Sequence, residues 1–78
     1  MEESIYSVFS SVFGVSASLL SATSSPDTIL GWDSFGHVEL IEALERTFSV
    51  RFAPDEIPEM QNLGAVQQVL RRRLGSPG

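Results

Sequence analysis

The sequence predicts an all-α domain, a four-helix bundle of three main helices and one short third helix, with a long loop between helices one and two. Apolar residues recur at three- and four-residue spacings in three separate segments, which is the spacing of one helix face. A chain of 78 residues without cysteine can bury only one modest core and has no disulfide to hold it. We therefore expect residues 1–78 to form a single domain, with residues 75–78 as a flexible tail.

The first helix is expected from about Ser4 to Phe13, with Ser4 as its cap, although Glu2 and Glu3 also suit a helix start if the cap lies earlier. Gly14 follows the last apolar residue and is well placed to end the helix in a left-handed conformation. The apolar side of this segment consists of Ile5, Val8, Phe9, Val12 and Phe13. One apolar side predicts that the helix packs against another helix.

Residues 15–33 form the least regular part of the sequence, and they are rich in serine. The Ser-Ser-Pro-Asp segment at 24–27 is a turn signal. A structureless loop of this length is uncommon in so small a domain. We therefore expect an ordered crossing loop with one helical turn. Its apolar members should pack onto the helices: Leu19, Leu20, Ile29, Leu30 and Trp32.

The second helix is expected from Ser34 to Phe48, with Asp33 as its cap. A carboxylate at this position also complements the positive end of the helix dipole. The core-facing stripe of the helix is Leu40, Ile41, Leu44 and Phe48. Phe35 and Val38 lie on an adjoining face, where the core stripe alone does not require apolar residues.

A short helix or a single turn is expected near residues 53–58, because proline is tolerated in a first turn but Pro58 prevents a long helix. Asn62 then caps a final helix from Leu63 to about Arg73, with three arginines at its negative dipole end. The inner side of this helix is Leu63, Val66, Val69, Leu70 and Leu74. The three main helices together predict a core of Phe9, Val12, Phe13, Leu40, Leu44, Phe48, Val66 and Leu70.

The chain carries a net charge of −5 and contains no lysine. An acidic surface argues against nucleic acid and favours partners with basic patches. The outer side of the second helix is acidic at Glu39, Glu42 and Glu45, and Glu42 and Arg46 have the spacing of an ion pair. No apolar run approaches the ~20 residues of a membrane span, and the N-terminus lacks the basic region of a signal peptide. These observations predict a soluble, cytoplasmic protein, which we expect to be monomeric.

The pair Asp33-Ser34, between the loop and the second helix, is the candidate site, although Asp-Ser is also a common helix start. A hydrolase serine needs a base within hydrogen-bond reach, a group that orients the base, and an oxyanion hole. His37 lies three residues after Ser34, and two residues at this spacing on one exposed helix seldom have that geometry. The Gly-x-Ser-x-Gly elbow is also absent. We therefore interpret His37 as a solvated helix residue and expect no enzyme. One histidine and no cysteine also exclude a multi-histidine or thiolate metal site, and no acidic pair has the spacing of a calcium loop.

The run GWDSFGHVELIEALERTF at residues 31–48 resembles the modification-site helix of acyl carrier proteins. Those proteins share a Gly-x-Asp-Ser-Leu signature, then Val-Glu-Leu, then Leu-Glu-x-x-Phe. The resemblance continues through Phe52, the acidic pair at 55–56 and the Asn-Leu-Gly-Ala-Val run at 62–66, so it covers residues 25–74. It implies an acyl-carrier-like helical bundle.

By this resemblance, Ser34 is the serine that a phosphopantetheinyl transferase modifies with 4′-phosphopantetheine from coenzyme A. Acyl cargo would then travel as a thioester on the terminal thiol of the arm, between acyl-loading, synthase and transferase enzymes with basic patches. The resemblance also implies that Asp33 helps to present the phosphodiester, and that magnesium is used by the transferase. Partner contacts are expected at Phe35, Val38, Glu39 and Glu42, because a transient interface combines exposed polar and apolar groups.

The sequence departs from the family pattern after the modified serine. Phe35 replaces the usual leucine, and Gly36 and His37 replace an acidic-polar pair. Glu42 stands where fatty-acid carriers usually have an apolar residue, and Arg46 where they usually have an acid. With the Ser-Pro-Asp-Thr-x-x-x-Trp-Asp-Ser form, these departures favour a discrete carrier in polyketide, fatty-acid-like or other specialised metabolism.

Two alternatives remain open. One is an aminoacyl or peptidyl carrier, which is disfavoured because Trp32 replaces the second glycine of the Gly-Gly-His/Asp-Ser motif of those carriers. The other is an unmodified helical adaptor that only binds partners. Loading with amino acids would distinguish the first alternative, and full activity of a Ser34→Ala variant would distinguish the second.

Overall fold

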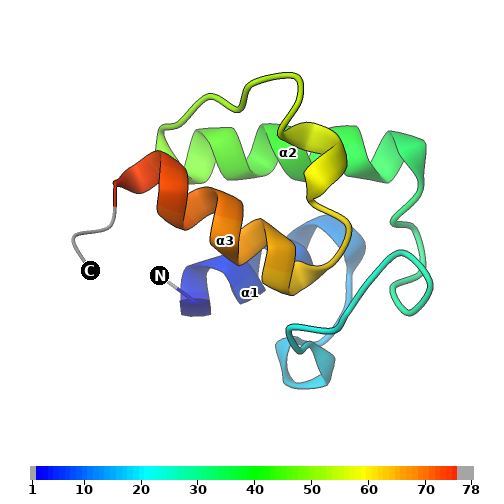
Figure 1. Ribbon diagram of the computed structural model, residues 1–78. Coiled ribbons are helices and arrows are strands. Elements are labelled where there is room, and N and C mark those ends of the chain that lie inside the picture. The colour runs from blue at the N-terminus through cyan, green and yellow to red at the C-terminus, as the bar shows by residue number, and fades with distance from the viewer. Residues whose placement is uncertain (1, 76–78) are drawn as a thin grey trace.

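The computed structural model describes residues 2–75 and folds them into three α-helices and two short 3-10 helices. In chain order the elements are α1 (Glu2–Phe13), η1 (Ala17–Leu19), α2 (Ser34–Phe48), η2 (Ile57–Glu59) and α3 (Leu63–Leu74). The prediction of an all-α fold with a long loop between the first two helices is confirmed (Figure 1). The short third helix exists as the single 3-10 turn η2. No helix in this part of the chain is long and apolar enough to cross a membrane.

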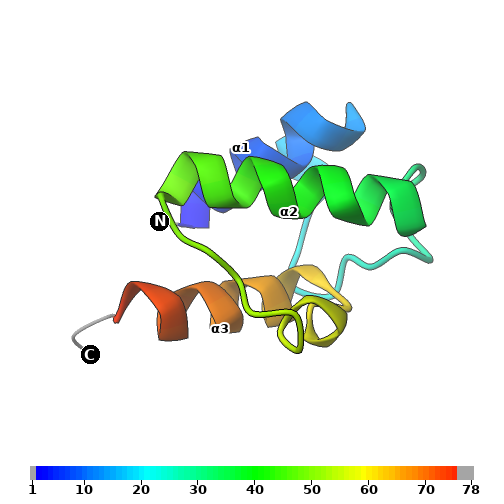
Figure 2. The same cartoon turned by 90° about the horizontal axis from the view of Figure 1, so that it is seen from above.

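The three α-helices surround one core. α1 packs against α2 and runs antiparallel to it, whereas α3 runs in roughly the same direction as α2 (Figures 1 and 2). Residues 49–62 cross from the end of α2 back to the start of α3, and η2 lies in this connection (Figure 2). The long loop connects the end of α1 to the start of α2. Both lie at the same end of the bundle, and η2 lies there too (Figures 1 and 2).

Helix boundaries follow the capping residues. α1 begins at Glu2, two residues before the expected start, so Ser4 is not the cap and the alternative of an earlier start at the two glutamates is the one that the structure shows. Gly14 ends α1 with φ +67°, as expected. The Asn62 side chain accepts the N–H of Ala65 at 2.7 Å and caps α3 as predicted. α3 ends one residue beyond the expected boundary, at a left-handed Gly75, and residues 76–78 of the predicted tail lie outside the described residues.

The core contains most of the predicted residues. Phe9, Leu40, Leu44, Val66 and Leu70 are fully buried. The others assigned to the core, Val12, Phe13 and Phe48, are only partly buried and pack against its edge, because they lie in the last turns of α1 and α2. The prediction that Leu74 faces inward was also wrong, since it is 41% exposed at the end of α3. Connecting segments supply further core residues, among them Leu20, Ile29, Trp32, Phe52 and Met60.

The long loop is ordered by its contacts with α3. The carbonyl oxygens of Ala22 and Ser24 accept the N–H groups of Gly64 and Leu63 at 2.9 and 2.8 Å. These N–H groups belong to the first turn of α3 and have no acceptor within the helix. The loop therefore supplies part of the N-terminal cap of a helix about forty residues further along the chain.

The prediction that all the apolar loop residues pack onto the helices was wrong for two leucines. Leu20 and Ile29 are buried as expected, but Leu19 is 79% exposed and Leu30 is 92% exposed. Adjacent residues in turns and extended backbone point in different directions, so only one member of each pair faces the core. The apolar character of these residues alone did not indicate which side chains point inward.

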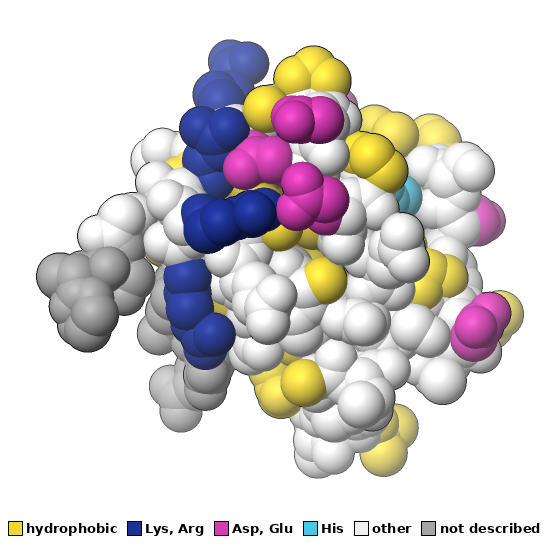
Figure 3. Space-filling model, in the orientation of Figure 1, with side chains coloured by type: hydrophobic (Ala, Val, Ile, Leu, Met, Phe, Trp, Pro, Cys, Tyr) yellow, Lys and Arg dark blue, Asp and Glu magenta, His cyan; other side chains and the backbone are white. Residues whose placement is uncertain are grey.

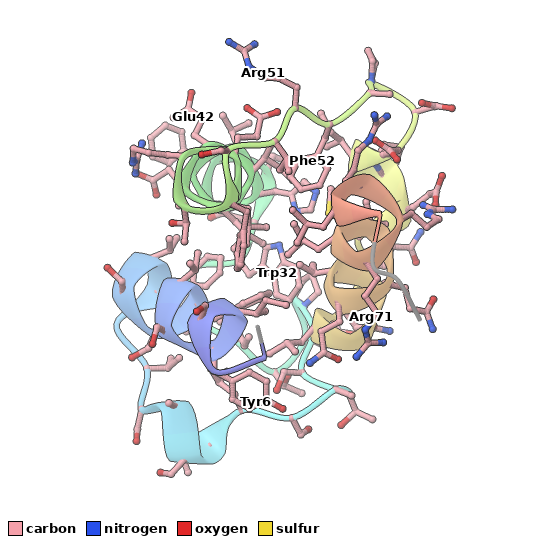
Figure 4. The ribbon with its side chains drawn as sticks, turned by 90° about the vertical axis from the view of Figure 1, so that its left-hand side faces the viewer. Tyr6, Trp32, Glu42, Arg51, Phe52 and Arg71 are labelled. Atoms are coloured by element: carbon pink, nitrogen blue, oxygen red, sulfur yellow. The ribbon has the colours of Figure 1, made fainter. Side chains whose placement is uncertain are left out.

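Glu45 was expected on the outer side of the second helix but is half-buried. Its carboxylate accepts the N–H of Phe52 at 2.9 Å and ties the connection after α2 to the helix. The Phe52 side chain points inward between α2 and α3 (Figure 4). Within residues 2–75, no ion pair joins Glu42 to Arg46, so that expected pair is not formed.

Glu56 joins the connection before η2 to the end of α3. Its Oε1 accepts the N–H of Ala53 at 2.8 Å and the Nε–H of Arg73 at 2.8 Å. The hydrogen bond from Ala53, and then the interactions with Arg73, lower the pKa of Glu56 below its ordinary value of 4.5. A lowered pKa in the folded state stabilises the protein above pH 4.5, and this contribution is lost as the pH falls through the lowered pKa.

We therefore expect a Glu56→Gln variant to lose less stability than the parent protein between pH 7 and pH 4. Urea unfolding followed by circular dichroism at both pH values measures the difference. Glu59→Gln is the matched control, because the Glu59–Arg72 pair at 2.7 Å is more exposed and such pairs contribute little. An equal loss of stability in the parent and in Glu56→Gln would contradict the prediction.

Candidate functional site at the start of helix α2

Ser34 is the first residue of α2, and it is exposed. The preceding Asp33 caps the helix as predicted, since its Oδ1 accepts the N–H of Gly36 at 2.9 Å. The carbonyl oxygen of Asp33 also accepts the N–H of His37 at 2.7 Å. These bonds fix the backbone on both sides of Ser34, while its hydroxyl has no hydrogen-bond partner among residues 2–75. The helix start therefore presents this hydroxyl to solvent on a rigid support.

The loop lies directly on the first turn of α2. Gly31 has φ +94°, a conformation that favours glycine, and its carbonyl oxygen faces Gly36. A Cβ atom on Gly36 would overlap that oxygen and lie 3.1 Å from Cε1 of Phe13. From the sequence, Gly36 was interpreted only as part of a replaced acidic-polar pair. The available signal was a glycine inside a strongly helical pattern, which usually has a packing reason.

Trp32 anchors the residues before the site in the core. It is 3% exposed, and its ring centroid lies 5.2 Å from that of Phe9 and 5.8 Å from that of Phe13. Its side chain lies between the three α-helices (Figure 4). The indole Nε1–H donates a hydrogen bond to Nδ1 of His37 at 2.9 Å. The backbone that leads into Asp33 and Ser34 is thus held from inside the bundle.

His37 is not the solvated residue that we expected. It is half-buried, and besides its bond to Trp32 its Nε2 lies 2.9 Å from the carbonyl oxygen of Ile57. The prediction was wrong because both partners are outside the helix, where helical periodicity carries no information. Both ring nitrogens are engaged in these bonds, so His37 is not placed to act as a base for Ser34.

A groove of about 410 Å³ adjoins Ser34 between the start of α2 and the η2 segment. It is lined by Pro26, Trp32, Asp33, Ser34, His37, Ile57, Pro58, Met60 and Gln61. Most of these side chains are apolar, so the groove suits a flexible chain with few charges better than an ion. Consistent with this, no group of three His, Cys, Asp or Glu side chains among the described residues could hold a metal ion.

The predicted partner residues share one exposed face of α2. Phe35 is 72% exposed and Val38 is 54% exposed, and Glu39 and Glu42 are exposed beside them. The labelled Glu42 side chain points away from α1 and α3 (Figure 4). The arginines gather at the opposite end of the molecule, where α2 and α3 end (Figure 3). The face next to Ser34 therefore combines apolar side chains with negative charge.

Comparison with known proteins identifies a family model that matches most of the chain and solved structures with the same fold. Residues 3–75 match the family model described as "Phosphopantetheine attachment site". The fold is similar to the solution NMR structure of a holo acyl carrier protein from Geobacter metallireducens, with a TM-score of 0.84 and 27% sequence identity. That match covers 95% of this chain and 85% of the other chain. No curated protein sequence gives a significant match.

Proposed function

The chain belongs to the phosphopantetheine attachment-site family, and from this premise we propose that Ser34 is the residue that bears the arm. The protein is a carrier of the acyl carrier type and not an enzyme, and its cofactor is a covalently attached 4′-phosphopantetheine. An unmodified adaptor is thereby set aside. The observation that supports Ser34 is its position, with an exposed and unpartnered hydroxyl at the first residue of α2.

The residues around Ser34 fit such a group. A phosphodiester on Ser34 is at the N-terminal end of α2, where the helix dipole and free N–H groups favour negative charge. The adjoining groove has apolar walls that suit an uncharged chain. When attached, the arm supplies the thiol that holds cargo as a thioester. Asp33 accepts the N–H of Gly36 and so fixes the first turn of α2, which keeps Ser34 in place.

For the cargo and pathway, we propose acyl groups in polyketide, fatty-acid-like or other specialised metabolism. This proposal is supported by the departures from the acyl carrier family pattern in the residues after Ser34. Phe35 is a bulky exposed residue immediately after the serine, where partner enzymes approach. Trp32 is buried, so it belongs to the fold and leaves Phe35 as the aromatic residue that partners meet. An aminoacyl or peptidyl carrier is the remaining alternative, and loading by adenylation enzymes would identify it. The cytoplasmic location and the monomeric state stay predictions.

The partner surface that we propose consists of Phe35, Val38, Glu39 and Glu42, and its partners are the phosphopantetheinyl transferase and biosynthetic enzymes with basic patches. Reversing the charge in Glu39→Lys should raise the KM of the transferase for this carrier roughly tenfold at low salt, because like charges then meet. High salt should reduce the difference. Asp55→Lys reverses an exposed acid outside this surface and serves as the control. Equal KM values for both variants would refute the assigned surface.

The experiment that tests the proposed function is a mass measurement. The purified chain is incubated with coenzyme A, magnesium and a broad-specificity phosphopantetheinyl transferase. We expect a gain of one phosphopantetheine unit, and peptide mapping should place it on Ser34 rather than on any of the other eleven serines. A gain on another serine would refute the site.

A further inference from the structure

The hydrogen bonds of His37 determine which of its nitrogens carries a hydrogen. The indole N–H of Trp32 can only donate, so Nδ1 of His37 must accept. The carbonyl oxygen of Ile57 can only accept, so Nε2 must carry the hydrogen and donate it. The two bonds together require the neutral Nε2–H tautomer.

These bonds join three parts of the chain around Ser34. Trp32 belongs to the long loop, His37 to the first turns of α2, and Ile57 to η2. We call the three residues the clasp. His37 is three residues after Ser34, so the two side chains are neighbours on α2, and the clasp residues line the same groove as Ser34. The clasp therefore fixes the loop and η2 relative to the serine.

We propose that His37 is a positioning residue for the modification of Ser34, because the clasp holds the loop, the start of α2 and η2 in the arrangement that the transferase binds. This inference rests on the proposed role of Ser34. A partner that binds only one arrangement has an apparent affinity reduced by the fraction of molecules in that arrangement. Opening the clasp therefore raises the KM of the transferase for the carrier and leaves kcat unchanged.

Three variants, Trp32→Phe, His37→Ala and His37→Gln, separate the clasp from general packing. Trp32→Phe removes the N–H donor and keeps an aromatic ring in the core. His37→Gln offers a carbonyl oxygen and an amide N–H to the same two partners. We expect Trp32→Phe and His37→Ala to raise KM roughly fivefold to tenfold, the effect of losing one or two ordinary hydrogen bonds, with little change in kcat. His37→Gln should recover part of the loss.

Nitrogen-15 NMR of the unmodified protein tests the clasp without the transferase. The imidazole shifts should show the Nε2–H tautomer, and the indole N–H resonance of Trp32 should move in a His37→Ala variant, which removes its acceptor. Arg72→Gln is the control for general loosening, since it removes a tie between η2 and α3 that does not involve the clasp, and its KM should equal that of the parent.

Three results would overturn the inference: an Nδ1–H tautomer, a parental KM in a folded Trp32→Phe variant, or a loss of kcat together with helicity in place of a raised KM. Failure of the proposed function gives a different result, because the parent protein would then acquire no phosphopantetheine on Ser34 while the NMR measurement still reports on the clasp.

Discussion

Ser34→Ala is expected to abolish the addition of phosphopantetheine completely while leaving the fold intact. The substitution removes the hydroxyl oxygen to which the phosphodiester is attached. It costs little stability, because the side chain is exposed and its hydroxyl has no partner among residues 2–75. Surface substitutions of this kind usually change the free energy of unfolding by less than about 0.5 kcal/mol. Intact mass after transferase treatment and urea unfolding measure the two effects separately.

The matched control is Ser7→Ala, which removes an exposed serine hydroxyl from α1. That variant should gain one phosphopantetheine unit at the rate of the parent. An addition that persists in Ser34→Ala would mean that another serine bears the arm. A large loss of stability in Ser34→Ala would mean that the serine has a structural role that its exposed position does not explain.

The helices were predictable because their signals are local. The apolar periods gave three helices, and Asp33, Asn62 and the left-handed Gly14 marked ends that the structure confirms. The errors occur where direction depends on contacts distant in the sequence. Leu19 and Leu30 point outward because Leu20 and Ile29 already face the core.

The candidate site was likewise predictable only where its signals are local. The pair Asp33-Ser34 was found from a local motif, and the structure gives its cap and its exposure. The role of His37 was missed because its two partners lie on either side of the helix that contains it. Ile57 is twenty residues away in sequence, and only the folded chain brings its carbonyl oxygen to the imidazole. No periodicity within α2 reports such a contact.

Gly36→Ala is expected to destabilise the protein by about 2 kcal/mol, although alanine in a helix is normally better than glycine by up to about 1 kcal/mol. The added Cβ would overlap the carbonyl oxygen of Gly31, which is backbone and cannot rotate away. Inserting an atom into a packed site typically costs about 1–3 kcal/mol and sometimes more. For a domain of this size the loss lowers Tm by roughly 8–16 °C, and circular dichroism during heating measures it.

Gly14→Ala separates this steric effect from the cost of glycine geometry. Gly14 has φ +67°, but no atom lies within 4 Å of the position of its Cβ. Alanine there costs about 1–2 kcal/mol from the left-handed conformation alone, without displacing a neighbour. Gly36 has a helical backbone with no such strain, so its cost arises from the loop that lies against it. The loop must move away from α2 in Gly36→Ala, and Trp32 with it, so the KM of the transferase should also rise in this variant but not in Gly14→Ala.

A Gly36→Ala variant as stable as the parent would show that the loop does not lie on the first turn of α2, and the account of how Ser34 is held would then be wrong.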